Sequence, residues 1–322
     1  MAEIEKTKRR TLRAKPFSRA DRAFYGISTL AANSSIVLVA LILVFLAIRS
    51  WPAFESQGFD FIFGSTWDAS PEVMKFQIWP MLWGSILISI LGVMLAVPMS
   101  ISIAYFIVFM ANKKIAKGVT ILVDLLAALP SVVLGLWGLL VFSPVAASWA
   151  ELLNQTLGFI PIFQNAGDNF FRSPFIAGWV VAVMIVPIIA SVTREIFSQL
   201  DRELINAALA LGAGRWSTLR RVILPTSSGG IVGGVLLGLG RALGETVAIL
   251  FVLNLAFETN WFNVLEAKGG SIASMILAKF GEAGPEEVAA LMAAGVVLFI
   301  VTLLVNSLAS YIVAKAQPWR RY

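Results

Sequence analysis

The chain has 322 residues, of which 58% are hydrophobic and 14% charged, whereas an average soluble domain has about 25% charged residues. Its formal net charge is +6, and it contains no cysteine and no histidine. Disulfides, thiolate nucleophiles, Ser-His-Asp triads and His-ligated metal sites are therefore excluded. The composition is that of a membrane protein, and the sequence predicts no catalytic residue, no cofactor and no metal site.

Six apolar stretches are long enough to cross a bilayer, which takes about 20 residues. They cover roughly residues 27–48, 79–110, 116–145, 175–197, 222–256 and 287–314. Pro130 interrupts the third stretch. The first is longer than the apolar part of a signal peptide and no A-x-A site follows it, so it is expected to be retained. The sequence thus predicts an all-α integral membrane protein with six transmembrane helices.

The distribution of basic residues predicts the orientation. With the N-terminus in the cytoplasm, 19 of the 25 Lys and Arg residues fall in cytoplasmic segments and 5 in outer loops. This bias follows the positive-inside rule and predicts cytoplasmic N- and C-termini. The positive charge therefore lies along a membrane face, which argues against a nucleic-acid partner.

Aromatic residues mark the ends of the predicted spans. An amphipathic indole ring is stable at the level of the lipid headgroups. Interfacial anchoring is therefore expected, and a docking surface for an external partner is the alternative. The tryptophans concerned are Trp51, Trp67, Trp79, Trp83 and Trp261.

The cytoplasmic segment between the fourth and fifth stretches, residues 194–225, is unusually long. Apolar residues recur in it at helical spacing, which predicts a short amphipathic helix. Gly212 and Gly214 then favour a helix end and a turn. An ordinary amphipathic connector lying on the membrane is one interpretation of this segment.

The same segment resembles the EAA motif of the membrane subunits of ABC importers. That motif reads EAA, three residues, Gly, nine residues, then I-x-L-P. The matching positions here are Ala207, Ala208, Gly212, Leu224 and Pro225. Asn206 stands where Glu is usual, and Val222 stands where Ile is usual. Asn206 has no charge for a salt bridge, but its side chain can still cap a helix or accept a hydrogen bond.

The resemblance implies a fold and a mechanism. The fold is a type I ABC importer permease core with a cytoplasmic coupling helix in a loop at about 196–222. This helix docks on a separate ATPase, whose ATP-driven closure switches the membrane subunits between inward- and outward-facing states. The implied organisation is a basic cytoplasmic segment (1–26), a first transmembrane helix with a first periplasmic loop (27–78), and the permease domain (79–316).

Arg241 and Glu245 lie inside the fifth apolar stretch. Being four residues apart, they are expected to share one face of a helix, with Arg241 about 24 Å beyond Pro225. A charge at the membrane centre costs at least about 2.5–3.5 kcal/mol, so each should pair and face protein. The pair is either a structural ion pair or an anion site, because a guanidinium matches a tetrahedral oxyanion such as phosphate.

The sequence around Arg241 and Glu245 resembles that of a narrower family. GLGRALGETVA at 238–248 and ALPSVVLGLWGL at 128–139 are similar to PstC-type membrane subunits of the phosphate ABC importer. The similarity covers roughly residues 20–316, although permeases for other oxyanions carry related sequences. No G-x-x-x-x-G-K-[ST] motif is present, so ATP is expected to bind another subunit. Gly230, Gly234 and Gly238 instead favour close packing of two helices.

Two further residues are candidates for the pathway. Pro130 breaks the third stretch, and freed backbone groups are tolerated only beside protein or a wet cavity, so Ser131 is assigned to the pathway. Asp124 is either an interfacial residue or a gating residue of the pathway.

The resulting hypothesis is a non-catalytic permease subunit of a bacterial inner-membrane phosphate importer. Its implied partners are a homologous second permease subunit, two ATP-binding subunits and a periplasmic phosphate-binding protein. An ABC permease for sulfate or molybdate is the first alternative. A secondary transporter driven by an ion gradient, with Glu245 and Asp124 as proton sites, is the second.

Overall fold

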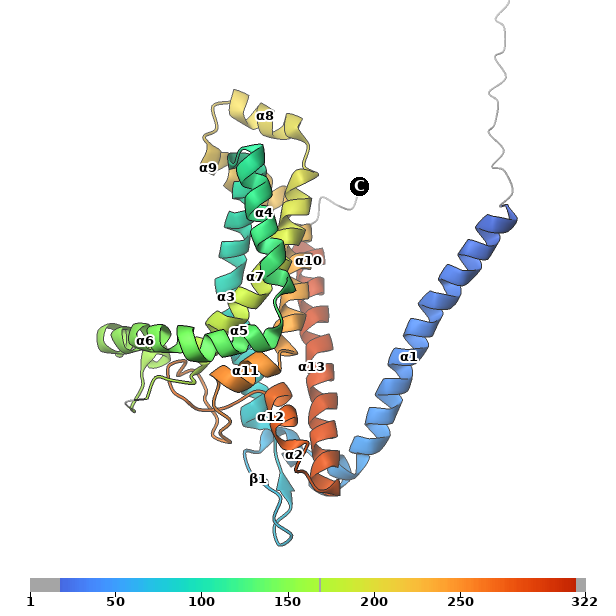
Figure 1. The fold of residues 1–322 in the computed structure, drawn as a ribbon, viewed down its shortest axis with the longest axis vertical. Coiled ribbons are helices and arrows are strands. Elements are labelled where there is room, and N and C mark those ends of the chain that lie inside the picture. Colours follow the sequence, from blue (N-terminus) through green and yellow to red (C-terminus); the bar gives the residue numbers. More distant parts are fainter. Residues whose placement is uncertain (1–17, 168, 317–322) are drawn as a thin grey trace, which may run out of the picture. The chain divides into compact units, whose positions relative to one another are not determined.

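The computed structural model describes residues 18–167 and 169–316, so residues 1–17 of the predicted basic segment lie outside it. The described part consists of helices joined by loops, with one short hairpin (Figure 1). Its α-helices are α1 Arg19–Gln57, α2 Asp60–Phe63, α3 Trp79–Tyr105, α4 Lys113–Ala128, α5 Ser131–Trp137, α6 Ser143–Leu157, α7 Pro174–Ser198, α8 Arg202–Ala210, α9 Arg215–Thr218, α10 Leu224–Leu243, α11 Val247–Val252, α12 Ile272–Lys279 and α13 Pro285–Ala316.

Short π-helical and 3₁₀ segments join several of these helices. The π turns are η1 Phe106–Met110, η2 Gly138–Phe142 and η4 Leu219–Ile223, and the 3₁₀ turn is η3 Pro161–Phe163. The strands β1 Trp67–Asp68 and β2 Lys75–Phe76 pair antiparallel, with Trp67 opposite Phe76. The predicted all-α class is therefore confirmed, with one hairpin added between α2 and α3.

The chain divides into two compact units, one ending at Ile48 and one beginning at Arg49. In the first unit, α1 begins with a capping box. The Ser18 hydroxyl accepts a hydrogen bond from the Asp21 N–H, and the Asp21 carboxylate accepts one from the Ser18 N–H. These bonds satisfy two backbone donors at the helix start, after which an apolar run carries the helix onward.

Six helices are long and apolar enough to cross a membrane, as predicted. They are Arg19–Gln57, Trp79–Met110, Ser131–Leu157, Pro174–Ser198, Arg215–Leu243 and Pro285–Tyr311.

The third membrane-length helix differs from its prediction. The break at Pro130 is confirmed, because α4 ends at Ala128 and α5 begins at Ser131. The predicted end near residue 145 is wrong, since helical structure continues through η2 and α6 to Leu157. Pro144 does not stop the helix because it occupies the first turn of α6, directly after a π turn, where a missing N–H costs little.

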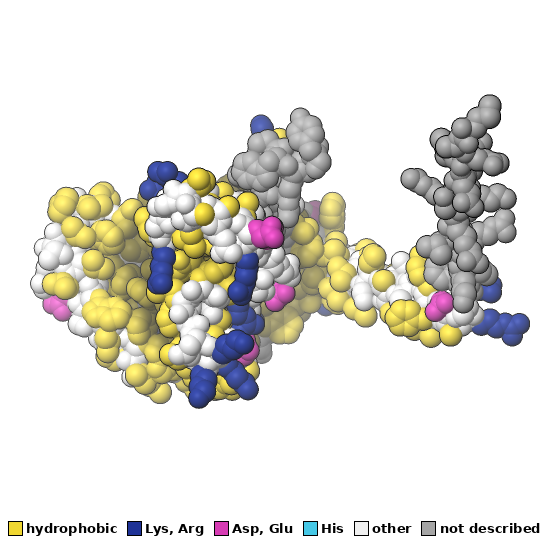
Figure 2. Space-filling model, turned by 90° about the horizontal axis from the view of Figure 1, so that it is seen from above, with side chains coloured by type: hydrophobic (Ala, Val, Ile, Leu, Met, Phe, Trp, Pro, Cys, Tyr) yellow, Lys and Arg dark blue, Asp and Glu magenta, His cyan; other side chains and the backbone are white. Residues whose placement is uncertain are grey.

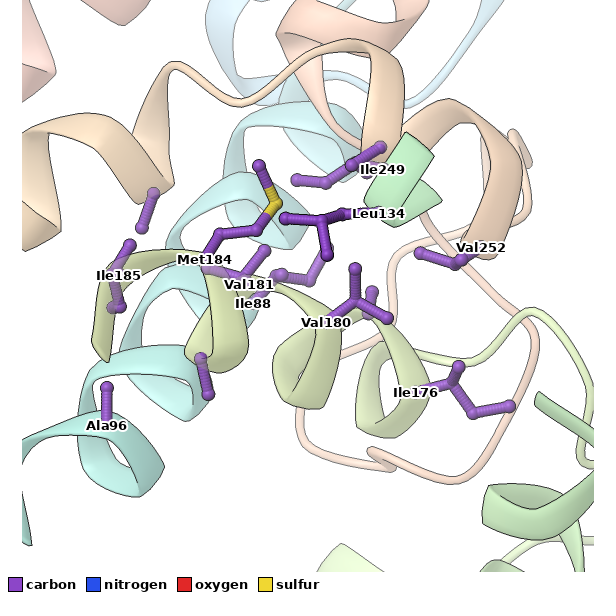
Figure 3. Close-up of a cluster of buried hydrophobic side chains, with 14 of the residues drawn as sticks. Ile88, Ala96, Leu134, Ile176, Val180, Val181, Met184, Ile185, Ile249 and Val252 are labelled. Atoms are coloured by element: carbon purple, nitrogen blue, oxygen red, sulfur yellow. The ribbon is translucent and has the colours of Figure 1, made fainter. Parts of the chain in front are cut away.

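The centre of the second unit is α7, which contacts α3, α4 and α10. Apolar side chains from α3, α5, α7 and α11 meet in one buried cluster, in which Met184 lies near Leu134 and Ile249 (Figure 3). In a bilayer the lipid is as apolar as leucine, so such helices are held by tight packing rather than by exclusion from water.

The three glycines predicted to favour helix packing lie on α10 where it contacts α7. A methyl group added at Gly230, Gly234 or Gly238 would press on Ile196, Val192 or Ile189 of α7, respectively. Bare backbone at these positions lets α7 and α10 approach closely, as the spacing predicted.

The hairpin, α12 and α13 are held together by polar contacts around Trp67. Its indole N–H donates to Glu287 Oε1 at 2.7 Å, and Lys279 Nζ lies 3.5 Å from the same carboxylate oxygen. Lys279 also lies 5.8 Å from the centre of the Trp67 ring. Trp67 therefore joins the hairpin to α12 and α13.

We expect Gly238→Val to destabilise the protein, because the added side chain meets Ile189 at 2.9 Å at the α7–α10 contact. Overpacking of this kind costs about 1–3 kcal/mol and lowers the melting temperature of the purified protein. Gly233→Val is the matched control, since nothing lies within 4 Å of a methyl group added there. Equal melting temperatures for the two variants would contradict the packing role of Gly238.

Candidate functional site

Arg241 and Glu245 lie on either side of a helix break. The fifth stretch was predicted to be one helix, but α10 ends at Leu243 and residues 244–246 are not helical before α11 begins. Gly244 is the C-cap residue of α10, and its N–H still donates to the Gly240 carbonyl. The predicted shared helix face is therefore wrong, because Glu245 lies beyond the helix that carries Arg241.

The two charges nevertheless form a pair. Arg241 Nη2 lies 3.9 Å from Glu245 Oε2, near the outer limit for an ion pair. The Glu245 side chain is 8% exposed, whereas that of Arg241 is 43% exposed. A buried carboxylate without a neighbouring cation is strongly disfavoured, and Arg241 supplies that neighbouring cation. One long contact leaves other guanidinium donors of Arg241 available to a ligand.

A cavity of about 570 Å³ opens beside this break. Gly244 and Thr246 line it from the break, and Ala273 and Leu277 line it from α12. Leu298 of α13 closes another side. Arg241 and Glu245 are not among its lining residues. The break therefore separates the charged pair from an adjoining, largely apolar space.

Ser131 is placed on a helix that contacts the break. It begins α5, and α5 packs against α11 through Gly135, where an added methyl group would lie 2.7 Å from the Cα of Ala248. Thus α5, which follows the break at Pro130, contacts α11, which follows the break at residues 244–246. No hydrogen bond between Ser131 and the charged pair is recorded among the residues that the structure describes.

Asp124 occupies a different position. It is exposed on α4, which contacts α7 and η1. Within residues 18–167 and 169–316, Asp124 makes no ion pair, and nothing recorded joins it to Arg241 or Glu245. Its assignment to the pathway stays a prediction.

Arg172 is a residue that sequence reasoning missed. Its Nη2 donates to the Leu250 carbonyl at 3.1 Å, and its own carbonyl accepts from the Asn254 N–H at 3.0 Å. A cation at the C-terminal end of a helix is favourable, so these contacts hold the end of α11. The backbone of Arg172 lies in the left-handed region with a φ of +55°. No local pattern links residues so far apart in sequence.

The loop expected to couple to an ATPase forms a separate exposed structure. The Asp201 side chain caps α8 by accepting from the Glu203 N–H at 2.8 Å. Asn206 and Ala207 are exposed and Ala208 is half-buried, while Ile205 packs towards the cluster around Phe197. Seen from this end, Lys and Arg side chains surround a partly apolar surface (Figure 2).

The remaining motif positions shape this loop. Gly212 has a φ of +83°, which side-chain-bearing residues rarely adopt, so it turns the chain after α8. Leu224 and Pro225 begin α10, and Leu224 packs in the cluster around Phe197. The structure adds two exposed apolar residues that the motif did not single out, Leu211 at 90% and Trp216 at 70% exposure.

Comparison with known proteins gives the family. The model of binding-protein-dependent transport system inner membrane components matches residues 96–318. The chain belongs to this family. It is a membrane component with several spanning helices, and the family's role is that of a permease subunit rather than a catalyst.

Curated relatives extend the likeness over most of the chain. The phosphate transport system permease protein PstC 2 of Mycobacterium bovis is 36% identical over 92% of this chain and 92% of its own length. The phosphate transport system permease protein PstC of Haemophilus influenzae is 38% identical over 91% of this chain and 93% of its own length.

Solved structures support the fold. A bacterial alginate ABC transporter, in complex with a periplasmic protein bound to alginate pentasaccharide, matches with a TM-score of 0.61 at 17% identity. That match covers 93% of this chain and 96% of the other. An inward-facing MetNI methionine ABC transporter matches with a TM-score of 0.53 at 16% identity, over 73% of this chain and 94% of the other. The predicted type I importer permease core is confirmed.

We expect Arg172→Ala to loosen α11. Alanine and arginine are similarly disfavoured at a φ of +55°, because both have a Cβ. The substitution therefore tests only the loss of the hydrogen bond from the guanidinium group to the Leu250 carbonyl. Loss of a hydrogen bond of about 0.5–1.5 kcal/mol predicts roughly 3- to 10-fold faster amide hydrogen exchange at residues 251–254. The control is Lys75→Ala, which removes a positive charge elsewhere in the outer loops. Unchanged exchange in Arg172→Ala would show that Arg172 does not hold the helix end.

Proposed function

We propose that this chain is the membrane subunit of an ATP-driven phosphate importer, and that Arg241 with Glu245 forms an anion station in its pathway. The relatives named as phosphate transport permeases support the substrate, and they match this chain over about nine-tenths of its length. The observation that carries the proposed site is the unequal exposure of the pair, 43% for the Arg241 side chain and 8% for that of Glu245.

The unequal exposure of the Arg241 and Glu245 side chains is suited to transient binding of an anion. Glu245 keeps a counter-charge beside Arg241 when no substrate is present, which lowers the cost of a cation in the membrane. A phosphate oxyanion approaching the exposed donors of Arg241 makes charge-assisted hydrogen bonds. Repulsion from the fixed carboxylate keeps this binding weak, so the anion is released onward. The pair is thus suited to transient binding rather than storage.

Energy input is assigned to a separate ATPase that docks on α8 and the turn at Gly212. Exposed Leu211 and Trp216 supply an apolar contact, and Asn206 supplies a hydrogen-bonding group without charge. The basic residues around this face support a cytoplasmic position for it and for both termini. The complete transporter contains a homologous second permease subunit, two ATPases and an external phosphate-binding protein.

We expect Arg241→Ala to reduce uptake of radiolabelled phosphate by roughly 10- to 100-fold, the range for a lost hydrogen bond to a charged group. Uptake is measured in cells with matched membrane abundance of the protein, with Lys75→Ala as the charge-matched control. Sulfate and molybdate are added as competitors. Full uptake by Arg241→Ala would refute the anion station, whereas competition by sulfate or molybdate would change the substrate.

Gly212→Val is predicted to weaken association with the ATPase, because a β-branched residue disfavours the φ of +83° that turns the chain there. Gly214→Val is the matched control, since Gly214 has a φ of −70° and open space around it. The measurement is the amount of ATPase that co-purifies with each variant from membranes. Equal recovery with both variants would contradict docking through this loop.

A further inference from the structure

The helical segment α5–η2–α6 lies across the bundle formed by α3, α7, α10 and α13, and α6 extends beyond it (Figure 1). The face of α6 that is buried consists of small residues, among them Ala146, Ala147 and Ala150. Its other flank exposes large apolar side chains, including Trp149 at 45% and Leu152 at 60%. We call residues 143–157 the arm.

The direction of the arm is informative. Transmembrane helices in known structures are tilted by about 20° on average, with a range of about 0–40°. Larger deviations are determined by packing against neighbouring helices, because lipid provides no comparable force. The arm contacts its own chain through its small-residue face, so its exposed apolar flank is available for a second protein surface.

An apolar groove of about 460 Å³ lies along α3, beside the base of the arm. It runs from Trp83 to Leu95, a length of about 18 Å along the helix axis. Its lining is entirely apolar or aromatic, and the one indole N–H at its rim, on Trp83, is already donated to the Trp261 carbonyl. Such a groove offers no donor to an anion, and it is suited to apolar side chains.

The arm and the groove are neighbours on one surface. Ala150 of the arm packs in a cluster that includes Leu87 and Leu91, two residues that also line the groove. One subunit therefore presents an apolar projection and an apolar recess side by side. A projection beside a recess is self-complementary under two-fold association, because the projection of each subunit then faces the recess of the other.

We propose that the groove along α3 receives the corresponding arm of the homologous second permease subunit, while the arm of this chain enters the matching groove of that subunit. This inference rests on the proposed function, which requires a second permease. The reciprocal contact buries both the exposed flank of the arm and the groove, and it accounts for the direction of α5 and α6 across the bundle.

The test is site-specific photo-crosslinking in the intact transporter in native membranes. Met94, a groove residue that is 68% exposed, is replaced by p-benzoylphenylalanine, and Leu304 of α13, 63% exposed, is replaced in the same way as the matched control. We expect irradiation to join the Met94 position to the second permease subunit, as identified by mass spectrometry, at a yield at least about tenfold above that at Leu304. Adducts with phospholipid alone, or equal yields at both positions, would overturn the proposed interface.

A second variant tests the groove without a crosslinker. Leu87→Trp fills the groove near its rim, and recovery of the second permease with the tagged chain is expected to fall several-fold relative to Leu304→Trp. Unchanged recovery would count against the interface. Phosphate uptake by the unmodified transporter is measured in parallel. If the unmodified transporter takes up phosphate but the crosslink and recovery results are negative, only the proposed interface is wrong. If it takes up no phosphate, the proposed transport function is wrong.

Discussion

The requirement that every charge and every free backbone group inside a bilayer has a partner governs this structure. Helical structure is interrupted at residues 244–246, between α10 and α11, next to the pair formed by Arg241 and the buried Glu245. The interruption is stabilised from two directions, because α5 packs on α11 at Gly135 and Arg172 binds the far end of α11. Protein thus packs against α11 at both of its ends, directly after the break that carries Glu245.

Close packing of α7 with α10 supports that arrangement. The glycines facing Ile189, Val192 and Ile196 remove the side chains that would hold the two helices apart. Since α10 begins at Leu224, directly after the exposed loop, and ends at Leu243, a helix of about 30 Å connects the proposed ATPase contact with the charged pair. In this proposal, movement of the loop that contains α8 is transmitted along the rigid helix α10 to the break at residues 244–246.

Aromatic rings as well as charges hold together the hairpin, the start of α3 and the loop that contains Trp261. Trp79, Trp83 and Trp261 lie with ring centres 6.0 Å apart, and Trp67 joins the hairpin to Glu287 and Lys279. Interfacial anchoring was the expected role of these tryptophans. Their mutual contacts also join the start of α3 to the loop that contains Trp261.

Hydropathy and residue spacing by themselves determined the class, the number of spanning helices, the break at Pro130 and the glycine packing stripe, while the resemblance of residues 206–225 and 238–248 to known motifs indicated the family. These features are local or periodic, so they can be recognised from neighbouring residues alone. The tertiary structure decided that the fifth helix ends before Glu245, that the third continues to Leu157, and that Arg172 holds α11. The Arg172 contact joins residues 78 positions apart, and helix propensity and hydropathy contain no information about such contacts. The two helix ends depend on local backbone geometry that the apolar pattern alone does not distinguish.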